Sequence, residues 1–194
     1  FLGVVRYYTI PFQEKDCCNG KWNKGPGKKL TDVMEESAGD CRIIADNAGS
    51  AIAGSRKLLA RIGWPGSKIL MFAFDGNTGN ENLPHNFEEN NIVVYTGTHD
   101  NDTLAGYLAE HTEQHEFMKQ YLHIDREEYI HDTMIGVLMR SVADIVILSI
   151  QDLLKVGTEG RINVPSTLGT NWKYRLPQNA LSDELACHLK ALTD

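Results

Sequence analysis

The sequence predicts an α/β protein built around a mostly parallel sheet. Four short apolar runs are rich in β-branched residues and nearly continuous, which is typical of strands buried on both faces. Segments with helical periodicity lie between them, and strands that alternate with helices indicate βαβ units. The predicted strands cover residues 42–45, 68–74, 92–96 and 144–150.

Capping signals and apolar spacing predict five helices. Asp102 is expected to cap the third helix, and Asp125 with Glu128 forms a capping-box-like start to the fourth. Ser182 or Asp183 is expected to cap the last. The helical segments are residues 28–38, 50–62, 103–110, a stretch from 125 through 138, and a stretch from 182 through 192.

Two architectures satisfy this order of elements. One is a complete, small doubly wound domain of the flavodoxin-like kind, and the other is part of an eight-stranded barrel. A full barrel takes about 250 residues. Four strands in 194 residues are therefore half of one, with long loops. The residues by themselves leave both architectures open.

The bulk composition is that of an ordinary globular chain, with 42% hydrophobic and 23% charged residues. The formal net charge is −7, and there is no run of Lys or Arg. This argues against nucleic-acid and membrane partners, because phosphates and anionic lipids require a basic patch. A neutral ligand such as a sugar suits this charge.

The cysteines show no metal-ligand spacing, so we interpret them as thiols of a reducing cytoplasm. His111 and His115 are four residues apart but lack an obvious third ligand. We expect neither a metal nor a cofactor. No apolar run is long enough to cross a bilayer. Phe1 begins in mid-pattern, so we expect a truncated start and a cytoplasmic protein, or a plastid protein if a transit peptide lies upstream. The four cysteines are Cys17, Cys18, Cys41 and Cys187.

Every predicted strand ends in a carboxylate or an amide. Asp46 and Asn47 follow the first strand, Asp75 the second and Asp152 the fourth, and residues 99–102 form a polar run after the third. Ligands bind at this edge of parallel α/β folds. A helix cap is enough to explain Asp152, and both interpretations stay open for Asp46 and Asp75. Four polar side chains in a row exceed one cap, so at least two of them are expected to face a site.

Converging carboxylates are typical of acid–base or nucleophilic chemistry at a glycosidic bond. His99 and the amide of Asn101 suit the recognition of sugar hydroxyls. Trp22 and Trp172 lie in predicted loops, where stacking on a pyranose ring and ordinary packing are equally good interpretations.

An ordered series of motifs resembles the 4-α-glucanotransferases, also called amylomaltases or disproportionating enzymes. The resemblance runs over nearly the whole chain with matching gaps, which is far more specific than an isolated T-H-D-N. The motifs that carry it are N-G-K-W (19–22), K-G-P-G (24–27), I-I-A (43–45), F-A-F-D-G (72–76), L-P-H-N (83–86), V-V-Y-T-G-T-H-D-N-D-T (93–103), Q-D-L-L (151–154), R-I-N-V-P (161–165) and N-W (171–172).

The resemblance implies one partial catalytic domain over residues 1–194, namely the C-terminal half (about strands 5 to 8) of a (β/α)8 barrel of the α-amylase type. It implies transfer of α-1,4-glucan segments between maltooligosaccharides or starch- and glycogen-like chains. The mechanism of such enzymes is retaining: a covalent glycosyl-enzyme forms, and a sugar hydroxyl releases it. An α-glucan hydrolase and a degenerate glucan-binding barrel remain as alternatives.

The resemblance also implies roles for individual residues. Asp100 matches the transition-state stabiliser, and Asp46 stands at the position of the general acid–base. The implied substrate contacts are His99, Asp75, His85, Asn47, Asn101, Trp172 and Asn171.

Two departures from the family pattern stand out. The family has A-E-D-L-G where residues 45–49 read A-D-N-A-G, so Asp46 replaces the acid–base Glu. The shorter side chain withdraws the carboxyl by about 1.5 Å, and a shift of about 1 Å can cost on the order of 10²-fold in rate. F-L-G at residues 1–3 matches the tail of R-x-D-H-F-R-G, with Leu2 for Arg. We therefore expect the nucleophile upstream of Phe1 and no activity from these residues alone.

Overall fold

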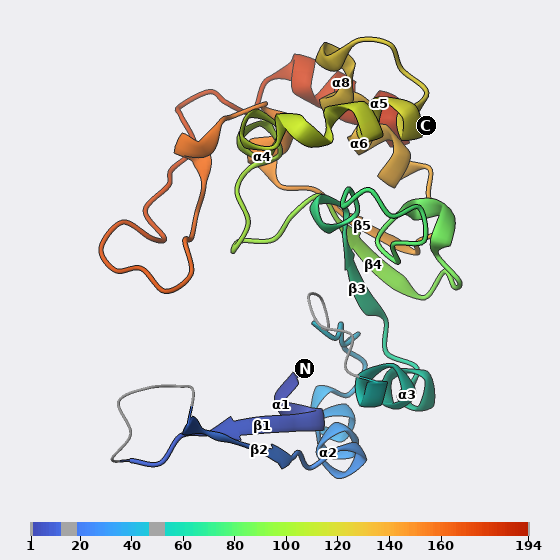
Figure 1. Ribbon diagram of the computed structural model, residues 1–194, viewed down its shortest axis with the longest axis vertical. Coiled ribbons are helices and arrows are strands. Elements are labelled where there is room, and N and C mark those ends of the chain that lie inside the picture. Colours follow the sequence, from blue (N-terminus) through green and yellow to red (C-terminus); the bar gives the residue numbers. More distant parts are fainter. Residues whose placement is uncertain (1, 13–18, 47–52, 194) are drawn as a thin grey trace. The chain divides into compact units, whose positions relative to one another are not determined.

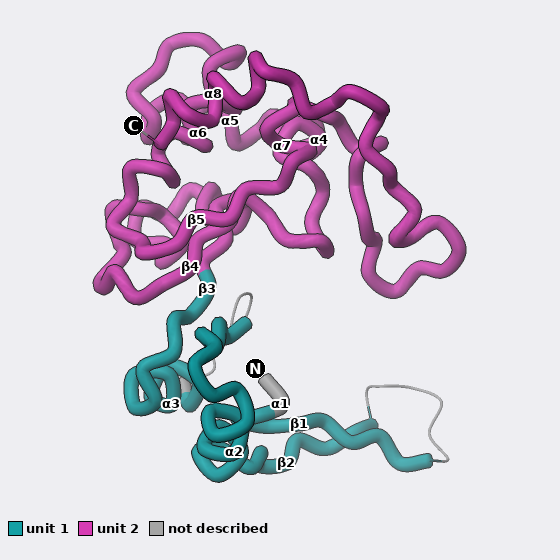
Figure 2. Tube along the Cα trace, turned by 180° about the vertical axis from the view of Figure 1, so that it is seen from behind, with its two compact units in different colours: residues 1–67 teal, residues 68–194 magenta. Residues whose placement is uncertain are grey.

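The computed structural model describes residues 2–12, 19–46 and 53–193. The chain forms two compact units, residues 1–67 and residues 68–194 (Figure 2). Within the described ranges, no helix is long and apolar enough to cross a membrane.

Unit 1 combines a β-hairpin with helices. In the hairpin, Arg6 lies opposite Lys24 and Thr9 opposite Lys21 in antiparallel register. Its strands are largely exposed and carry no buried apolar run, which is why sequence patterning did not predict them. The elements of this unit are α1 (Leu2–Val5), β1 (Arg6–Thr9), β2 (Lys21–Lys24), α2 (Lys28–Ala38) and α3 (Ala53–Ile62).

The prediction of a strand at residues 42–45 is wrong, although the last of these residues is buried as predicted. Ala45 is 3% exposed and packs in a small core with Trp64. Its N–H donates to the Pro65 carbonyl at 3.0 Å, and its carbonyl accepts from the Ser67 hydroxyl at 3.0 Å. Because Pro65 has no N–H, these contacts cannot continue as a β-ladder.

A three-stranded sheet with the order β3–β4–β5 confirms the α/β class. It consists of β3 (Gly66–Ile69), which spans the boundary between the units, β4 (Ile92–Tyr95) and β5 (Ile145–Ile147). β4 and β5 are parallel, with Val93 opposite Ile145, as the uninterrupted apolar runs predicted. Val93 and Val94 are fully buried, so β4 is the central element of the sheet in both position and packing.

Two predicted strands are shorter than their apolar runs. After Ile69 the chain enters a 3-10 turn, η2 (Leu70–Phe72), although the run stays mostly buried. After β5, the Ser149 hydroxyl accepts from the Asp152 N–H at 3.1 Å and begins α7 (Ile150–Leu153). A continuous apolar run does not distinguish a buried strand from a buried helical turn.

Helix α6 is the centre of the packing in unit 2, and it contacts α4, α5 and α8. Figure 1 shows these helices gathered on the same side of the sheet. The Met134 and Leu138 side chains of α6 are 0% and 1% exposed. The helices are α4 (Leu104–Glu110), α5 (His115–Leu122), α6 (Ile130–Met139) and α8 (Asp183–Thr193), with 3-10 turns η3 (Pro84–Asn86), η4 (Thr112–Gln114), η5 (Glu127–Tyr129) and η6 (Thr158–Gly160).

The predicted helices at residues 28–38 and 103–110 are confirmed, whereas two of the predicted caps are wrong. Thr103, not Asp102, caps α4, because its hydroxyl accepts from the Gly106 N–H at 3.1 Å. Helix α6 begins after η5 without a side-chain cap, so the expected capping box is absent there. Ser182 does cap α8, since its hydroxyl accepts from the Leu185 N–H at 3.2 Å.

A pair of alanine substitutions tests this packing. Leu138→Ala removes a side chain that is 1% exposed, so we expect the free energy of unfolding to fall by about 2–5 kcal/mol in urea titrations. Val142→Ala, at a residue that is 59% exposed, is the control and should change it by no more than about 0.5 kcal/mol. Equal effects of the two substitutions would contradict the assignment of α6 to the core.

Candidate functional site

The loop between β4 and α4 closes on itself and presents two polar side chains. The Asn101 amide oxygen accepts from the Thr98 N–H at 2.8 Å and from the Thr98 hydroxyl at 2.9 Å. A Cβ on Gly97 would lie 2.8 Å from the Met71 sulfur, so a larger residue there would force the Met71 side chain to move. The His99 and Asp100 side chains are left 55% and 51% exposed.

Two residues of a later loop fix Asp100. The Asn163 amide nitrogen donates to Asp100 Oδ1 at 2.6 Å, and Arg161 Nη2 donates to the Asp100 carbonyl at 2.9 Å. Arg161 Nε also donates to the Asn163 carbonyl at 3.0 Å, which joins the two supports. His99 Nε2 lies 3.4 Å from the same carboxylate oxygen. Asp100 thus keeps its position while its carboxylate stays open to solvent on one side.

Sequence reasoning assigned no role to Arg161 and Asn163, although both belong to the R-I-N-V-P motif. The signal that points to them is their spacing: two polar side chains flank Ile162, so in an extended segment both fall on one side.

Trp172 places an aromatic ring beside His99. The ring centroids are 5.2 Å apart at an interplanar angle of 39°, and Trp172 is 62% exposed. Its φ is 64°, a left-handed conformation that costs a non-glycine residue of order 1–3 kcal/mol. The Trp172 N–H donates to the Ile162 carbonyl at 2.8 Å and helps to hold this conformation. An open indole face next to a carboxylate and an imidazole can stack on a sugar ring.

Asn171 shapes the loop that carries Trp172. Its amide oxygen accepts from the Val164 N–H at 3.0 Å, and its amide nitrogen donates to the Thr167 carbonyl at 3.1 Å. Asn101 does the same for the β4–α4 loop. These contacts give both amides a structural task, and their contact with a substrate stays a prediction.

Asp75 and His85 belong to a second loop, residues 73–86. Asp75 Oδ1 accepts from the Asn77 N–H at 2.9 Å in a tight turn. His85 Nε2 lies 3.1 Å from the Thr78 carbonyl, and its Nδ1 lies 3.2 Å from the Tyr121 hydroxyl. Burial raises the pKa of the Tyr121 phenol. Both predicted residues remain exposed at the surface of unit 2.

The other predicted catalytic residue, Asp46, lies in unit 1 at the surface, directly after buried Ala45. The exposed thiols Cys41 and Cys187 are free. Asn47, Cys17 and Cys18 lie outside the described residues, and so does Phe1.

His111 and His115 bind backbone oxygens. His111 Nδ1 lies 3.0 Å from the Tyr107 carbonyl, and His115 Nε2 lies 3.0 Å from the Leu108 carbonyl. Across residues 2–12, 19–46 and 53–193, no three His, Cys, Asp or Glu side chains gather as a metal site.

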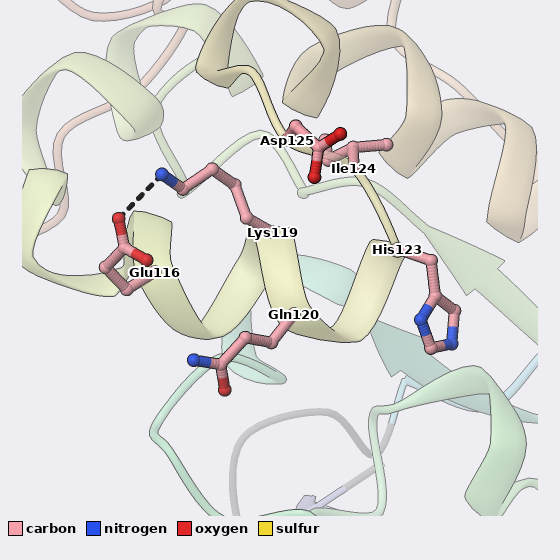
Figure 3. Close-up of a pocket in the computed structure, with 6 residues that line it drawn as sticks. All are labelled: Glu116, Lys119, Gln120, His123, Ile124 and Asp125. Atoms are coloured by element: carbon pink, nitrogen blue, oxygen red, sulfur yellow. Dashed lines mark ion pairs between the residues drawn. The ribbon is translucent and has the colours of Figure 1, made fainter.

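A separate open depression of about 340 Å³ lies at the end of α5 (Figure 3). Its Lys119 ammonium pairs with Glu116 at 2.6 Å, and the contacts with Glu116 raise the pKa of Lys119. None of the residues predicted for the site lines it. The lining residues are Glu116, Lys119, Gln120, His123, Ile124 and Asp125.

The start of α4 is held against η6. The Thr158 hydroxyl donates to Asp102 Oδ2 at 2.8 Å, while Asp102 Oδ1 accepts from the Thr103 N–H at 2.7 Å. Gly106 lies directly beneath this contact: a Cβ there would lie 2.5 Å from the Thr158 hydroxyl oxygen.

Comparison with known proteins shows the family of this chain. A family model described as 4-alpha-glucanotransferase matches residues 1–181. The chain belongs to the 4-alpha-glucanotransferase family. The T-H-D-N loop, the R-I-N segment that supports it and Trp172 all lie inside the matched residues, and the resemblance seen in the motifs is confirmed.

Relatives in this family come from bacteria and plants. The 4-alpha-glucanotransferase of Clostridium butyricum is 42% identical over 195 residues, which cover 100% of this chain and 40% of that protein. The chloroplastic/amyloplastic 4-alpha-glucanotransferase of Solanum tuberosum is 37% identical over 100% of this chain and 34% of its own length. The amylomaltase of Streptococcus agalactiae, solved in complex with acarbose, has a TM-score of 0.90 and 33% identity over 100% of this chain and 39% of that chain. The chain thus spans about two fifths of the length of these 4-alpha-glucanotransferases.

Two helical glycines provide a matched test of the α4 contact. Alanine is favoured over glycine in helices by about 1 kcal/mol, yet Gly106→Ala forces a Cβ against Thr158 and Asp102. We expect a net loss of about 1–3 kcal/mol in the free energy of unfolding. In Gly136→Ala in α6 the atoms nearest to the new Cβ belong to the end of the long Arg140 side chain, at 3.2 Å, so this substitution should stabilise by roughly 0.5–1 kcal/mol. Urea titration measures both, and a stabilising Gly106→Ala would refute the close contact.

Proposed function

We propose that this chain carries part of the glucan-binding and catalytic face of a 4-α-glucanotransferase. The enzyme transfers α-1,4-glucan segments to an acceptor sugar hydroxyl through a retaining, covalent glycosyl-enzyme. One observation carries the proposal: within a chain of this family, Asp100 is held by Asn163 and lies beside His99, next to the open ring of Trp172.

Each of these groups has a task in such a reaction. The transition state of glycosyl transfer resembles an oxocarbenium ion, so the fixed carboxylate of Asp100 stabilises the positive charge that develops. His99 binds sugar hydroxyls in the central subsite. Trp172 stacks on a neighbouring pyranose ring. Asp46 acts as general acid–base, giving a proton to the leaving oxygen and then taking one from the acceptor hydroxyl.

The remaining predicted contacts belong to the same proposal. They bind hydroxyls along the glucan chain through carboxylate, imidazole and amide groups. These residues are Asp75, His85, Asn47, Asn101 and Asn171.

We also propose that the strands are part of a (β/α)8 barrel, about strands 5 to 8. The helices of unit 2 gather on one side of the sheet, as a barrel requires, whereas a doubly wound sheet carries helices on both faces (Figure 1). The similarity to the Streptococcus agalactiae amylomaltase supports this architecture for residues 1–194 as one catalytic domain.

The substrates we propose are maltooligosaccharides and starch- or glycogen-like chains, without nucleic-acid or membrane partners. The acarbose complex of the Streptococcus agalactiae relative supports a sugar ligand. The cellular location stays a proposal, with the cytoplasm and the plastid as the two alternatives, and the plant relatives favour considering the second.

A second candidate function is that of a barrel that binds glucans but no longer catalyses their transfer. Asp46 favours it, because its carboxyl is one methylene shorter than that of the Glu in the family motif. A hydrolase of the same superfamily would instead release the glycosyl-enzyme with water.

A chimera distinguishes these functions. The 194 residues replace the matched 195 residues of the Clostridium butyricum protein, and maltotriose is supplied. We expect oligosaccharides longer than maltotriose, with Asp100→Asn lowering kcat about 10²- to 10³-fold because a charge stabiliser is lost. Asp125→Asn, at an exposed carboxylate beside α5, is the control and should leave the rate unchanged.

The products of this assay decide among the alternatives. Glucose and maltose alone would indicate a hydrolase, and maltotriose binding without products would indicate the degenerate barrel. Full activity of Asp100→Asn would remove the residue from the proposed mechanism.

Asp46→Glu in the same chimera tests the departure from the family pattern. The longer side chain returns the carboxyl to the position implied by the family, so we expect kcat for transfer to rise by up to about 10²-fold. Asp40→Glu, an exposed residue of the same unit, is the matched control. No gain with Asp46→Glu would argue that the surroundings of Asp46 already compensate for the missing methylene.

A further inference from the structure

Asp152 is a buried carboxyl that the sequence explains only as a helix cap. It is 1% exposed. Buried polar groups are costly unless hydrogen-bonded, and ionisable ones most of all. The cap of α7 is already supplied by Ser149, whose hydroxyl accepts from the Asp152 N–H at 3.1 Å. The Asp152 side chain is therefore not needed for its own helix.

Its two oxygens instead bind two other elements. Oδ1 accepts from the Leu104 N–H at 2.7 Å, and Oδ2 accepts from the Thr96 hydroxyl. Thr96 directly follows β4, and Leu104 is the first residue of α4. Both partners are 0% exposed. One side chain therefore ties together the two ends of the loop that carries His99 and Asp100.

We infer that Asp152 is a positioning residue of the site: by joining Thr96 to Leu104 it sets where the loop presents Asp100. Asn163 and Arg161 hold Asp100 from the far side, so the loop is fixed both at its base and at its tip. The inference deepens the proposed function and rests on it for the consequence in ligand binding.

The two hydrogen-bond partners explain why residue 152 is an aspartate. The Leu104 N–H and the Thr96 hydroxyl both donate, and a carboxylate offers one acceptor oxygen to each. Asparagine would turn an N–H₂ group toward one of them. Thr96 is the better position for a test, because Thr96→Val removes only the hydroxyl at nearly constant shape, while Thr96→Ser keeps it.

The test compares wild type, Thr96→Val and Thr96→Ser in the 194-residue chain. Hydrogen–deuterium exchange measures amides of residues 97–104 and, as reference, of α6 (Ile130–Met139). We expect exchange of residues 97–104 to rise about tenfold in Thr96→Val, as the loss of one buried hydrogen bond implies. Thr96→Ser should match wild type, and α6 should not change. The affinity for acarbose, measured by calorimetry on the same variants of the chimera with the Clostridium butyricum protein, should weaken about tenfold in Thr96→Val only.

Each other outcome counts against the inference. Unchanged loop exchange, an equal rise in α6, or the same behaviour in Thr96→Ser would each show that Asp152 does not position the loop. A freer loop with unchanged acarbose affinity would show that the position does not matter to the site. If the chimera with the wild-type residues does not bind acarbose, the proposed function fails for this chain, and the exchange data alone decide whether Asp152 positions the loop.

Discussion

The attachment of the β4–α4 loop to the body of unit 2 is the contact on which the site depends. The loop starts from the buried strand β4. Asp152 accepts hydrogen bonds from Thr96, which directly follows β4, and from Leu104, which begins α4. A carboxyl buried in this position would lower the stability of the fold if it lacked its two hydrogen-bond partners. With both it joins α7 to the end of β4 and to the start of α4, which lie 56 and 48 positions earlier in the sequence.

From this base the site is built outward in layers. The Thr98–Asn101 contacts shape the loop, and Arg161 and Asn163 then fix its exposed tip. The groups proposed to meet the sugar come last and are the most exposed. Burial therefore decreases from the sheet to the solvent, while the hydrogen bond from Asn163 keeps the exposed Asp100 carboxylate in place, as a preorganised charge stabiliser requires.

The sequence predicted the class of the fold well because buried parallel strands are written as continuous runs of apolar, β-branched residues. It predicted β4 almost to the residue, and the loop after it. The hairpin of β1 and β2 was missed because its strands are exposed. Residues 42–45 were wrongly predicted as a strand because the apolar run itself gives no sign that its partner segment contains Pro65, which ends the hydrogen-bond ladder. For the site, the loop of Asp100 could be named from its run of polar residues. The spacing of Arg161 and Asn163 could show only that their side chains share one side of the segment, since Asn163 is 63 positions from Asp100 and nothing local links the two.

The loop that carries Trp172 is closed by its own amide, Asn171, and it contacts the segment that holds Asp100. The Trp172 N–H donates to the Ile162 carbonyl, between Arg161 and Asn163, which both bind Asp100. The aromatic ring and the carboxylate therefore share one support at residues 161–163. A change in this segment would displace both groups together, so we expect ring stacking and charge stabilisation to be kept or lost as a pair.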